Sequence, residues 1–454
     1  MSGVNAVEQE APTEPVRIFG VAHGGAGVGR RINEADGATV GEHPETRTWL
    51  VDGALPGEIV QVRRTQTEKR LIRGVTATVA MASEQRVSPP CPLSETCGGC
   101  NWQHVAPAAQ LELKRQIVQG QLRRFDVEVE AAAPSPSALG YRRRARLHYE
   151  QTEDGQWRLG FRRARSHEIV DVPRCAVLDA PLQHAAERVR GLLPLLPARG
   201  EILGLSDGER AALGLPGVRL TDALTAALAG VLDDVLVGFS VRGGRQRQAI
   251  GRAKLEIDGP QRDGEPVPIL VSPFVFTQAQ GAVNRALVRY VTAQAEPAGA
   301  RVLELYAGAG NFTRALAGTA KRVWAIDESR EAIACLQGLV ERFGLPVTAR
   351  NGKSEGFLGK LARADRARGH DYDVVVLDPP RRGLGRQPAR WLASTRPARV
   401  VYVSCDPATL ARDLEVFVKS GYTLERVRVF DLMPMTSEVE IVATLRRRKK
   451  EAGA

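Results

Sequence analysis

The spacing of apolar residues changes along the chain and predicts three structured regions. In residues 16–80, short apolar segments such as 49–51 and 59–62 alternate with turns that contain Gly and Pro. Residues 55–58 (Leu-Pro-Gly-Glu) are typical of a turn between two strands. Short strands at this spacing predict a compact β-barrel. Its return strand carries five basic residues, Arg63, Arg64, Lys69, Arg70 and Arg73.

Residues 81–271 have a mixed pattern, which predicts a central α+β domain. Residues 108–125 place apolar side chains at helical spacing and therefore predict a helix. The alternation at 146–150 indicates a strand, and residues 157–161 resemble its hairpin partner. The stretch 178–235 is rich in Leu and Ala, carries no chemical motif, and is expected to serve packing.

Residues 272–446 alternate between strand-like and helix-like segments. The first four strand-like segments are almost continuous apolar runs, as expected for parallel strands that are covered on both faces. The five segments are 301–306, 322–327, 372–378, 399–404 and 439–445. The pattern predicts a doubly wound, Rossmann-like α/β domain, in which ligands bind beyond the carboxyl ends of the strands.

The two ends of the chain do not resemble folded segments. Residues 1–15 have no basic start and no apolar stretch, so we expect a disordered tail rather than a signal peptide. Residues 447–454 are expected to form a short basic tail. The sequence contains no run of 18 apolar residues, which argues against a membrane-spanning helix. We therefore expect a cytoplasmic monomer that does not associate with membranes.

The charge of the chain suggests a partner. The 454 residues carry a net charge of +11, and the sequence pI is about 9.6. A basic surface can serve solubility alone, but clustered arginines favour a phosphate-rich partner, because one guanidinium can bind two oxygens. The clusters are Arg142, Arg143, Arg144 and Arg146; Arg162, Arg163 and Arg165; and Arg242, Arg245 and Arg247.

The turn after the first parallel strand suits a nucleotide-like ligand. Strand 301–306 continues into residues 307–311 (Ala-Gly-Ala-Gly-Asn), whose glycines let a ligand approach the backbone. The next strand ends at Asp327, where a carboxylate can bind ribose hydroxyls; a helix N-cap is the alternative. Together these features favour an adenosine-containing cofactor without identifying it.

Three residues at the same predicted sheet edge can carry chemistry. Asp378 is held by two following prolines and can read the polar edge of a planar base, unless it is only a turn aspartate. Cys405 precedes a predicted helix, whose positive end would lower the pKa of the thiol and make it a nucleophile. Glu440 begins the last strand, and an antiparallel orientation would bring it to Cys405 as a proton acceptor. A small core cysteine and a surface glutamate are the alternatives for the last two.

Four cysteines could together form a metal site. Cys91, Cys97 and Cys100 are close in sequence, two glycines separate the last two, and Cys175 lies far downstream. Because disulfides are unexpected in a cytosolic protein, we prefer four thiolates that bind zinc or an iron–sulfur cluster. Thiols without a metal are the alternative.

Together these residues resemble the RNA 5-methyluridine (uracil-carbon-5) methyltransferase family, and in particular its subgroup acting on 23S ribosomal RNA. Residues 16–80 resemble the TRAM RNA-binding module, a small OB-like barrel, and residues 91–105 with Cys175 resemble the [4Fe-4S] ligand set of the family. The remaining motifs follow in the family's order: 276–278 (FTQ), 304–313 (ELYAGAGNFT), 378–383 (DPPRRG), 404–413 (SCDPATLARD) and 434–440. The likeness covers nearly the whole chain.

The resemblance implies a role for each candidate residue. Cys405 would attack carbon 6 of a uracil, and Glu440 would remove the hydrogen from carbon 5 after methylation. Asp378 would hold the edge of the uracil. The cofactor S-adenosylmethionine would be held by Gln278, Tyr306, Asn311, Asp327 and Asp378, and a [4Fe-4S] cluster by Cys91, Cys97, Cys100 and Cys175. The RNA, expected to be 23S rRNA, would be gripped by the barrel and the arginine clusters while the target base leaves its stack.

The chain departs from the family at and around the cofactor pocket. Glu304, Gln280 and Glu438 stand where the family usually has Asp, Asn and His. Lys353 stands where an acidic or amide residue is usual, and Ala334 and Cys335 replace asparagines. These changes keep three alternatives open: an RNA-binding paralogue that has lost methyl transfer, the same chemistry on tRNA, or methylation of an adenine amine. The last would not need Cys405.

Overall fold

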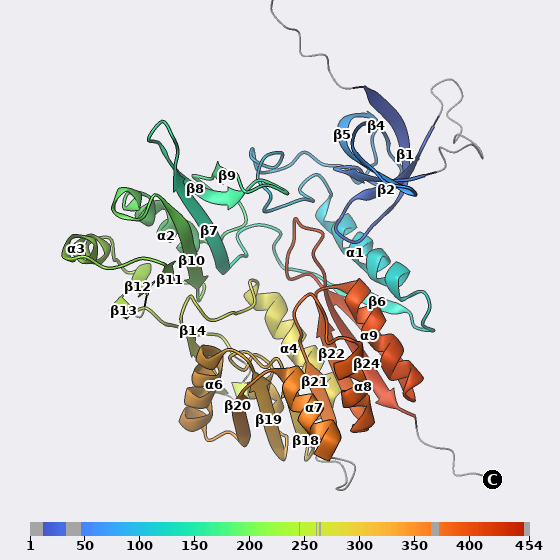
Figure 1. Ribbon diagram of the computed structural model, residues 1–454, viewed down its shortest axis with the longest axis vertical. Helices are drawn as coiled ribbons and strands as arrows, with labels where there is room; N and C mark the ends of the chain where they lie inside the picture. Colours follow the sequence, from blue (N-terminus) through green and yellow to red (C-terminus); the bar gives the residue numbers. More distant parts are fainter. Residues whose placement is uncertain are drawn as a thin grey trace, which may run out of the picture.

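The computed structural model describes residues 12–32, 47–244, 246–259, 261–262, 265–364 and 372–448. The expected tails lie largely outside these residues, as does Arg245. Figure 1 shows a barrel (blue), a central sheet (green) and a C-terminal α/β domain (yellow to red), with α1 between the barrel and the C-terminal domain.

The N-terminal region folds as a closed five-stranded barrel with the strand order β1-β2-β3-β5-β4. Its strands are β1 Thr13–Val21, β2 Gly27–Arg31, β3 Thr48–Asp52, β4 Ile59–Thr67 and β5 Leu71–Met81. Alternate residues such as Val16, Ile18, Trp49 and Val51 point inward and are buried, as the period of a half-buried strand requires. The predicted barrel is confirmed, and it begins a few residues before residue 16.

The central domain is built on a seven-stranded sheet with the order β13-β12-β11-β10-β7-β8-β9. Its strands are β7 Arg144–Gln151, β8 Trp157–Arg162, β9 Ile169–Asp171, β10 Arg199–Ser206, β11 Ala211–Pro216, β12 Leu236–Gly243 and β13 Gln246–Gly251. Helices α2 Ala180–Arg190 and α3 Asp222–Gly230 pack on it. The predicted hairpin is the antiparallel pair β7–β8. The stretch 178–235 supplies much of the core, as expected.

Short two-stranded ladders connect the central sheet to the C-terminal domain. They are formed by β14 Leu255–Ile257 with β17 Ile269–Val271, and by β15 Gln261–Arg262 with β16 Glu265–Pro266.

The C-terminal domain contains an eight-stranded sheet with the order β20-β19-β18-β21-β22-β24-β23-β6. Its strands are β6 Val129–Ala133, β18 Arg301–Leu305, β19 Arg322–Asp327, β20 Val347–Asn351, β21 Val374–Leu377, β22 Arg399–Ser404, β23 Tyr422–Phe430 and β24 Glu440–Arg447. Strands β20, β19, β18, β21 and β22 are parallel, and the chain switches direction along the sheet between β18 and β21. Such a switch point opens a crevice for ligands at the carboxyl edge.

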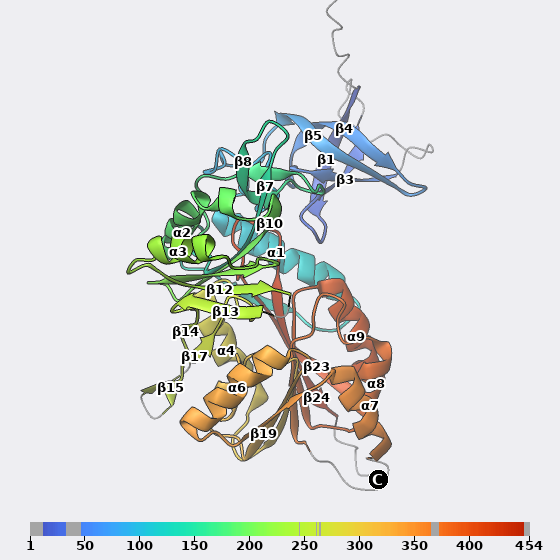
Figure 2. The same cartoon turned by 60° about the vertical axis from the view of Figure 1, so that its left-hand side comes forward.

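Helices cover both faces of this sheet (Figure 2). One layer contains α4 Gly281–Ala295, α5 Thr313–Leu316 and α6 Arg330–Phe343. The other contains α1 Pro107–Leu122, α7 Ser354–Ala364, α8 Arg386–Ser394 and α9 Pro407–Lys419. Helix α1 and strand β6 precede the central domain in sequence but pack on the C-terminal sheet, because Val118, Leu122 and Val129 complete its core. Among the described residues, none of the helices is long and apolar enough to cross a lipid bilayer.

Candidate active site

A first pocket, of about 810 Å³, lies at the carboxyl ends of β18 and β21. Four of the residues expected to hold the cofactor line it: Gln278, Tyr306, Asn311 and Asp378. The turn after β18 forms its floor. Tyr306 there has φ +59°, a strained conformation for a bulky residue and one often found at ligand sites.

Asn311 is fixed before any ligand arrives. Its side-chain amide exchanges two hydrogen bonds of 2.9 Å with that of Asn284 on α4.

Asp327, in contrast, is not among the residues that line the first pocket. Its carboxylate accepts hydrogen bonds from the backbone N–H groups of Gly308 (2.9 Å) and Ser329 (2.8 Å). In the structure, Asp327 therefore ties the β18 turn to the β19 turn, while Ser329 is the N-cap of α6.

A second pocket, of about 1010 Å³, adjoins the first. Gln278 lines both pockets and so marks their boundary. Cys405, Glu438 and Glu440 line the second pocket, together with arginines of the 142–146 cluster. A planar group in the second pocket would therefore lie beside a ligand in the first.

The strand register explains why Cys405 and Glu440 meet. Strands β22 and β24 are antiparallel, with Ser404 opposite Ile441, so the next pair along the ladder is Cys405 and Glu440. The predicted antiparallel orientation is confirmed. Cys405 is half-buried, and Glu440 is 9% exposed.

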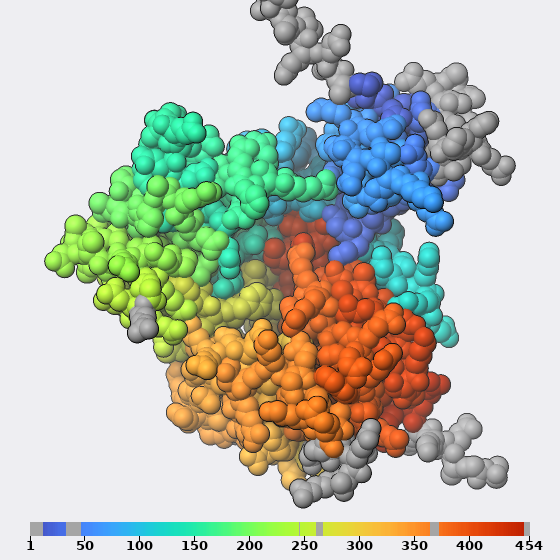
Figure 3. Space-filling view, viewed as in Figure 1, coloured from blue at the N-terminus to red at the C-terminus, as the bar shows by residue number. Residues whose placement is uncertain are grey.

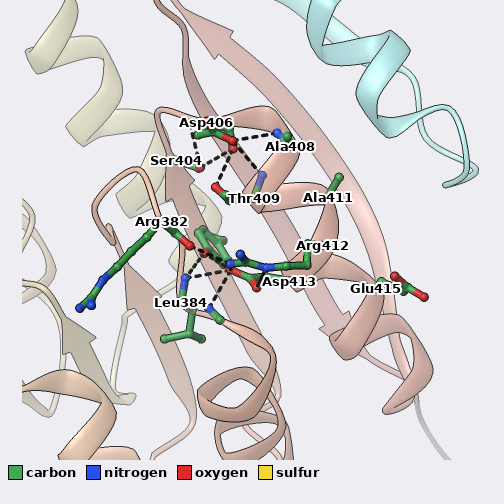
Figure 4. Close-up of polar contacts among 12 residues, drawn as sticks. Arg382, Leu384, Ser404, Asp406, Ala408, Thr409, Ala411, Arg412, Asp413 and Glu415 are labelled. Atoms are coloured by element: carbon green, nitrogen blue, oxygen red, sulfur yellow. Dashed lines mark hydrogen bonds and ion pairs between the residues drawn. The ribbon is translucent and has the colours of Figure 1, made fainter. Parts of the chain in front are cut away.

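Helix α9 follows the cysteine directly. Pro407 occupies its first turn, and the N-cap Asp406 accepts hydrogen bonds from the N–H groups of Ala408 and Thr409, at 3.0 and 2.8 Å (Figure 4). At the other end of the motif, buried Asp413 accepts hydrogen bonds from the Leu384 N–H and the Tyr402 hydroxyl, both at 2.8 Å. The motif 404–413 thus ties the cysteine to the loop that carries Asp378.

Burial favours the neutral form of two carboxyl groups at the site. Burial raises the pKa of Asp378 to about 7. Burial, with the charges of Asp378 and Glu438, raises the pKa of Glu440 well above its usual range. Each of these acids can therefore hold a proton near neutral pH.

The thiol of Cys405 does not follow the prediction from the helix position. Burial, followed by the charges of Glu440 and Asp378, raises the pKa of Cys405 to about 12. The expected lowering by α9 is therefore wrong, because desolvation and the nearby acidic groups outweigh a helix dipole. Arg381 is the one group among the main causes that acts in the opposite direction.

The residues that depart from the family lie in different places. Glu438 forms an ion pair of 2.5 Å with Arg381 at the second pocket. Glu304 is buried beneath the first pocket, accepts a hydrogen bond from Thr313 (2.6 Å), and has its pKa raised by burial to about 8. Gln280 caps α4, and exposed Lys353 is not among the residues lining either pocket.

Several residues that the sequence analysis missed hold the loop before Glu440, residues 431–439. Buried Lys114 on α1 donates to Asp431 (2.6 Å) and to the Met433 carbonyl (3.0 Å). Tyr141 donates to the Pro434 carbonyl (2.9 Å), and the Trp102 N–H to the Met435 carbonyl (3.0 Å). A lysine on the apolar side of a predicted helix was the one available signal, since such a lysine needs a buried acid.

The barrel also contacts the segments beside Cys405 and Glu440, through the turn between β1 and β2. The Nε2 atom of His23 lies 3.3 Å from the Asp406 carboxylate, and the Trp102 indole donates to the Gly25 carbonyl (3.0 Å). Gly25 has φ +89°, and a Cβ there would lie 2.6 Å from Ser437. A glycine is therefore required where the turn meets the loop before Glu440.

The four cysteines line one cavity of about 420 Å³ in the central region. Gly98 lets the cysteine loop approach the end of β8: its N–H donates to the Arg162 carbonyl (2.9 Å), and a Cβ would lie 2.7 Å from Ala164. In the part of the chain that the structure describes, no three His, Cys, Asp or Glu side chains are close enough to share a single metal ion.

Comparison with known families gives one family match. The sequence pattern of the family described as tRNA (Uracil-5-)-methyltransferase matches residues 272–346 and 351–448. This region contains Gln278, Cys405 and Glu440 but not the barrel or the loop of residues 91–100 that carries three of the cysteines.

Relatives resemble the chain over nearly its whole length. A protein of Halomonas elongata named 23S rRNA (uracil(1939)-C(5))-methyltransferase RlmD is 33% identical over 477 residues, covering 97% of this chain and 91% of the relative. A protein of the same name from Alkalilimnicola ehrlichii is 33% identical and covers 97% and 98%. Among solved structures, the Pyrococcus abyssi tRNA (uracil-54, C5)-methyltransferase in complex with S-adenosyl-L-homocysteine is similar with a TM-score of 0.70, at 24% identity, covering 95% of this chain and 99% of that chain.

Proposed function

The chain belongs to the family of 23S rRNA (uracil-C5)-methyltransferases, and we propose that it methylates carbon 5 of a uracil in 23S rRNA. It is therefore an enzyme and not only an RNA-binding protein. The relatives that match its full length, barrel included, are named for uracil 1939 of 23S rRNA, which favours that substrate over tRNA.

One observation carries this proposal. Cys405 follows β22, Glu440 begins the neighbouring strand β24, and both line a pocket that shares Gln278 with the pocket at the carboxyl ends of β18 and β21. A uracil beside the cysteine would therefore lie next to a methyl donor in the first pocket. Methylation of an adenine amine would require neither Cys405 nor Glu440 at this place.

The first pocket has the features that S-adenosylmethionine requires. Gln278, Tyr306, Asn311 and Asp378 line it and would contact the cofactor, while Asp327 would act mainly by holding the Gly308 turn. When bound, the cofactor supplies an electrophilic methyl group on a sulfonium. Asp378 would in addition hold the polar edge of the uracil, because it lines the first pocket, lies near enough to Cys405 for its charge to act on the thiol, and can keep a proton near neutral pH.

The chemistry divides between Cys405 and Glu440. After the thiol proton has passed to solvent, the Cys405 thiolate forms a bond to carbon 6, and the electrons of the C5–C6 double bond move into an enolate, which makes carbon 5 nucleophilic. Carbon 5 then gains the methyl group. Glu440 must be ionised at this stage: its carboxylate accepts the remaining C5 proton, the C5–C6 double bond re-forms, and the bond from carbon 6 to sulfur breaks with its electron pair on the sulfur. The products are 5-methyluracil, the demethylated cofactor and one proton.

Burial raises the pKa of the Cys405 thiol, so the thiolate needs a further stabilising charge. A positive charge in the neighbouring pocket favours the thiolate by Coulomb attraction. Cofactor binding would therefore prepare the nucleophile only when the methyl group is present.

Cys91, Cys97, Cys100 and Cys175 fit an iron–sulfur cluster better than a single metal ion. They surround one cavity but are too far apart to share an ion, whereas each thiolate of a [4Fe-4S] cluster binds a different iron. When bound, the cluster would tie the loop of residues 91–100 to Cys175. Iron and sulfide analysis tests this: Cys175→Ser should lose both, and the control Cys335→Ser on α6 should keep both.

The function is tested by methylation of RNA. Purified protein and radiolabelled S-adenosylmethionine should convert one uracil of a 23S rRNA transcript into 5-methyluracil, located by mass spectrometry. Methylation of an exocyclic amine, or of tRNA in preference to 23S rRNA, would contradict the proposal.

A further inference from the structure

A groove of about 970 Å³ lies outside both pockets, between the end of α1, the start of α8 and one side of α9. Four arginines line it: Arg123, Arg124, Arg386 and Arg412. Three of them are exposed, and the Arg412 side chain is 33% exposed. The groove is therefore an open surface depression with guanidinium groups on its walls.

The charges of the groove are only partly compensated. Glu415 is the one acid among its lining residues and lies 3.5 Å from Arg124, while Arg412 pairs with buried Asp413 (3.0 Å). Arg123 and Arg386 form no ion pair with any residue that the structure describes, although the charge of Arg386 acts on Glu415 nearby. The groove thus contains more arginines than acidic side chains.

The start of α8 adds to the positive potential. Gly385 is the N-cap and supplies no side-chain hydrogen bond to the first turn, which begins at Arg386 in the groove. A helix N-terminus attracts anions through its free N–H groups and its dipole. Arg386 brings the first turn of α8 to the wall of the groove, while the Gly385 N–H already donates to Asp413 (3.2 Å).

The groove begins close to Cys405. Ala408, Ala411 and Glu415 follow one another along one side of α9, and Figure 4 shows them on the side that faces α1. Ala408 is three residues from Cys405, and Ala411 lies about 4.5 Å further along the helix axis. A strand that delivers its base to Cys405 would therefore reach the groove within a few nucleotides.

We propose that this groove binds the phosphates of the nucleotides next to the target uracil. The inference rests on the proposed function, because it takes RNA as the substrate. Evenly repeated phosphates match guanidinium groups spread along a channel, and each can accept two hydrogen bonds from one arginine. By holding the backbone beside the base, the groove offsets part of the cost of turning the uracil out of its stack.

The test uses Arg123→Glu/Arg386→Glu and two RNAs. One is a long 23S rRNA transcript around the target, and the other is a short oligonucleotide that fills only the base pocket. The double variant should lower kcat/KM for the long RNA about tenfold and leave the short RNA and S-adenosylmethionine binding unchanged. The slope of the logarithm of the long-RNA binding constant against the logarithm of the salt concentration should become shallower by about 1.4, which is roughly 0.7 for each of two lost phosphate contacts.

Two controls complete the design. Arg289→Glu/Arg363→Glu, which makes the same charge change at exposed positions on α4 and α7, should stay within about twofold of the unchanged protein. Arg123→Lys/Arg386→Lys should retain most long-RNA binding, since it keeps the charges. Equal methylation of the long RNA by the Glu double variant and the unchanged protein would overturn the proposal.

Binding is also measured by fluorescence anisotropy of the labelled long transcript, so the groove is tested even if no RNA is methylated. Absence of methylation by the unchanged protein would count against the proposed function. Equal RNA affinity of the Glu double variant and the unchanged protein would count against the groove. An affinity loss only for acidic peptides, and not for RNA, would assign the groove to a protein partner and would also overturn the proposal.

Discussion

The base pocket and the arginine groove lie at the same end of α9 but have opposite character. The base pocket contains Cys405 and Glu440, with Asp378 close by, and burial favours the neutral forms of all three side chains. The groove contains Arg123 and Arg386, which are exposed and charged. In Figure 3 the C-terminal domain that carries both regions meets the barrel and the central domain near the middle of the molecule.

This contrast shows how one surface can both grip a polyanion and do proton chemistry. Proton transfer benefits from a carboxyl group whose pKa lies near the working pH, and burial moves the pKa of Asp378 there. Backbone binding requires cations that remain hydrated until a phosphate replaces the water. Changes in the base pocket should therefore mainly lower kcat, and changes in the groove mainly raise KM for RNA.

The largest effect is expected at Cys405. Cys405→Ala removes the atom that activates carbon 5, so methylation of the 23S transcript should fall at least about 10⁴-fold. Binding of S-adenosylmethionine, measured by calorimetry, should not change. Cys335→Ala on α6 is the matched control and should keep full activity; a residual rate of Cys405→Ala above about 1% would show that the sulfur is not the nucleophile.

The next effect is expected at Glu440. Glu440→Gln leaves the attack possible but removes the acceptor of the C5 proton, so turnover should fall about 10²–10⁴-fold. A covalent protein–RNA species should accumulate and be visible on denaturing gels. Glu438→Gln, which breaks only the ion pair with Arg381, should lose less than about tenfold. If both variants lose activity equally, Glu440 has no special role.

A smaller effect on kcat, with a clear loss of stability, is expected at the loop before Glu440. Lys114→Met leaves Asp431 buried without its partner and should lower the free energy of unfolding by about 3–5 kcal/mol. Arg115→Met, one position along the same helix, breaks only the exposed pair with Glu112 and should cost less than about 1 kcal/mol. Thermal and denaturant unfolding measure both. Equal losses would mean that Lys114 does not anchor the loop.

The last prediction concerns the pH dependence of stability at Glu304. Its pKa is about 8 in the folded protein and near 4.5 when unfolded, so its neutral form stabilises the fold at low pH. That contribution is lost as the pH rises from about 4.5 to 8, at up to about 1.4 kcal/mol per pH unit. Glu304→Gln should remove this slope, and its Tm relative to the unchanged protein should increase between pH 5 and 8. A constant Tm difference would contradict the raised pKa.

The strands and motifs of the α/β domain could be predicted because their signals are local. The runs 322–327 and 399–404 coincide with β19 and β22, and the position of Glu440 followed once β24 was taken as antiparallel. Strands β20 and β23 were not predicted, because their partly exposed residues interrupt the apolar run. The addition of β6 to the sheet depends on contacts between distant segments, which spacing along the chain does not encode.

The sequence identified the residues of the candidate site, but it did not predict their pKa values or their hydrogen bonds. The motifs named Cys405, Glu440 and Asp378, whereas the pKa of Cys405 depends on how completely the folded chain buries it and on the charges beside it. Asp327 shows the same limit: its position after β19 is visible in sequence, but its bonds to Gly308 and Ser329 are not. The residues that hold the loop before Glu440 come from α1 and the central region, so no local pattern could group them.

The central claim is a covalent bond between Cys405 and carbon 6 of the uracil. An RNA whose target base is 5-fluorouracil offers Glu440 no proton at carbon 5, so the bonded state should persist after methyl transfer. Mass spectrometry should then find protein plus RNA plus one methyl group, only when S-adenosylmethionine is present and not with Cys405→Ala. If normal RNA is methylated under the same conditions but the fluorinated RNA yields no adduct, the account is contradicted.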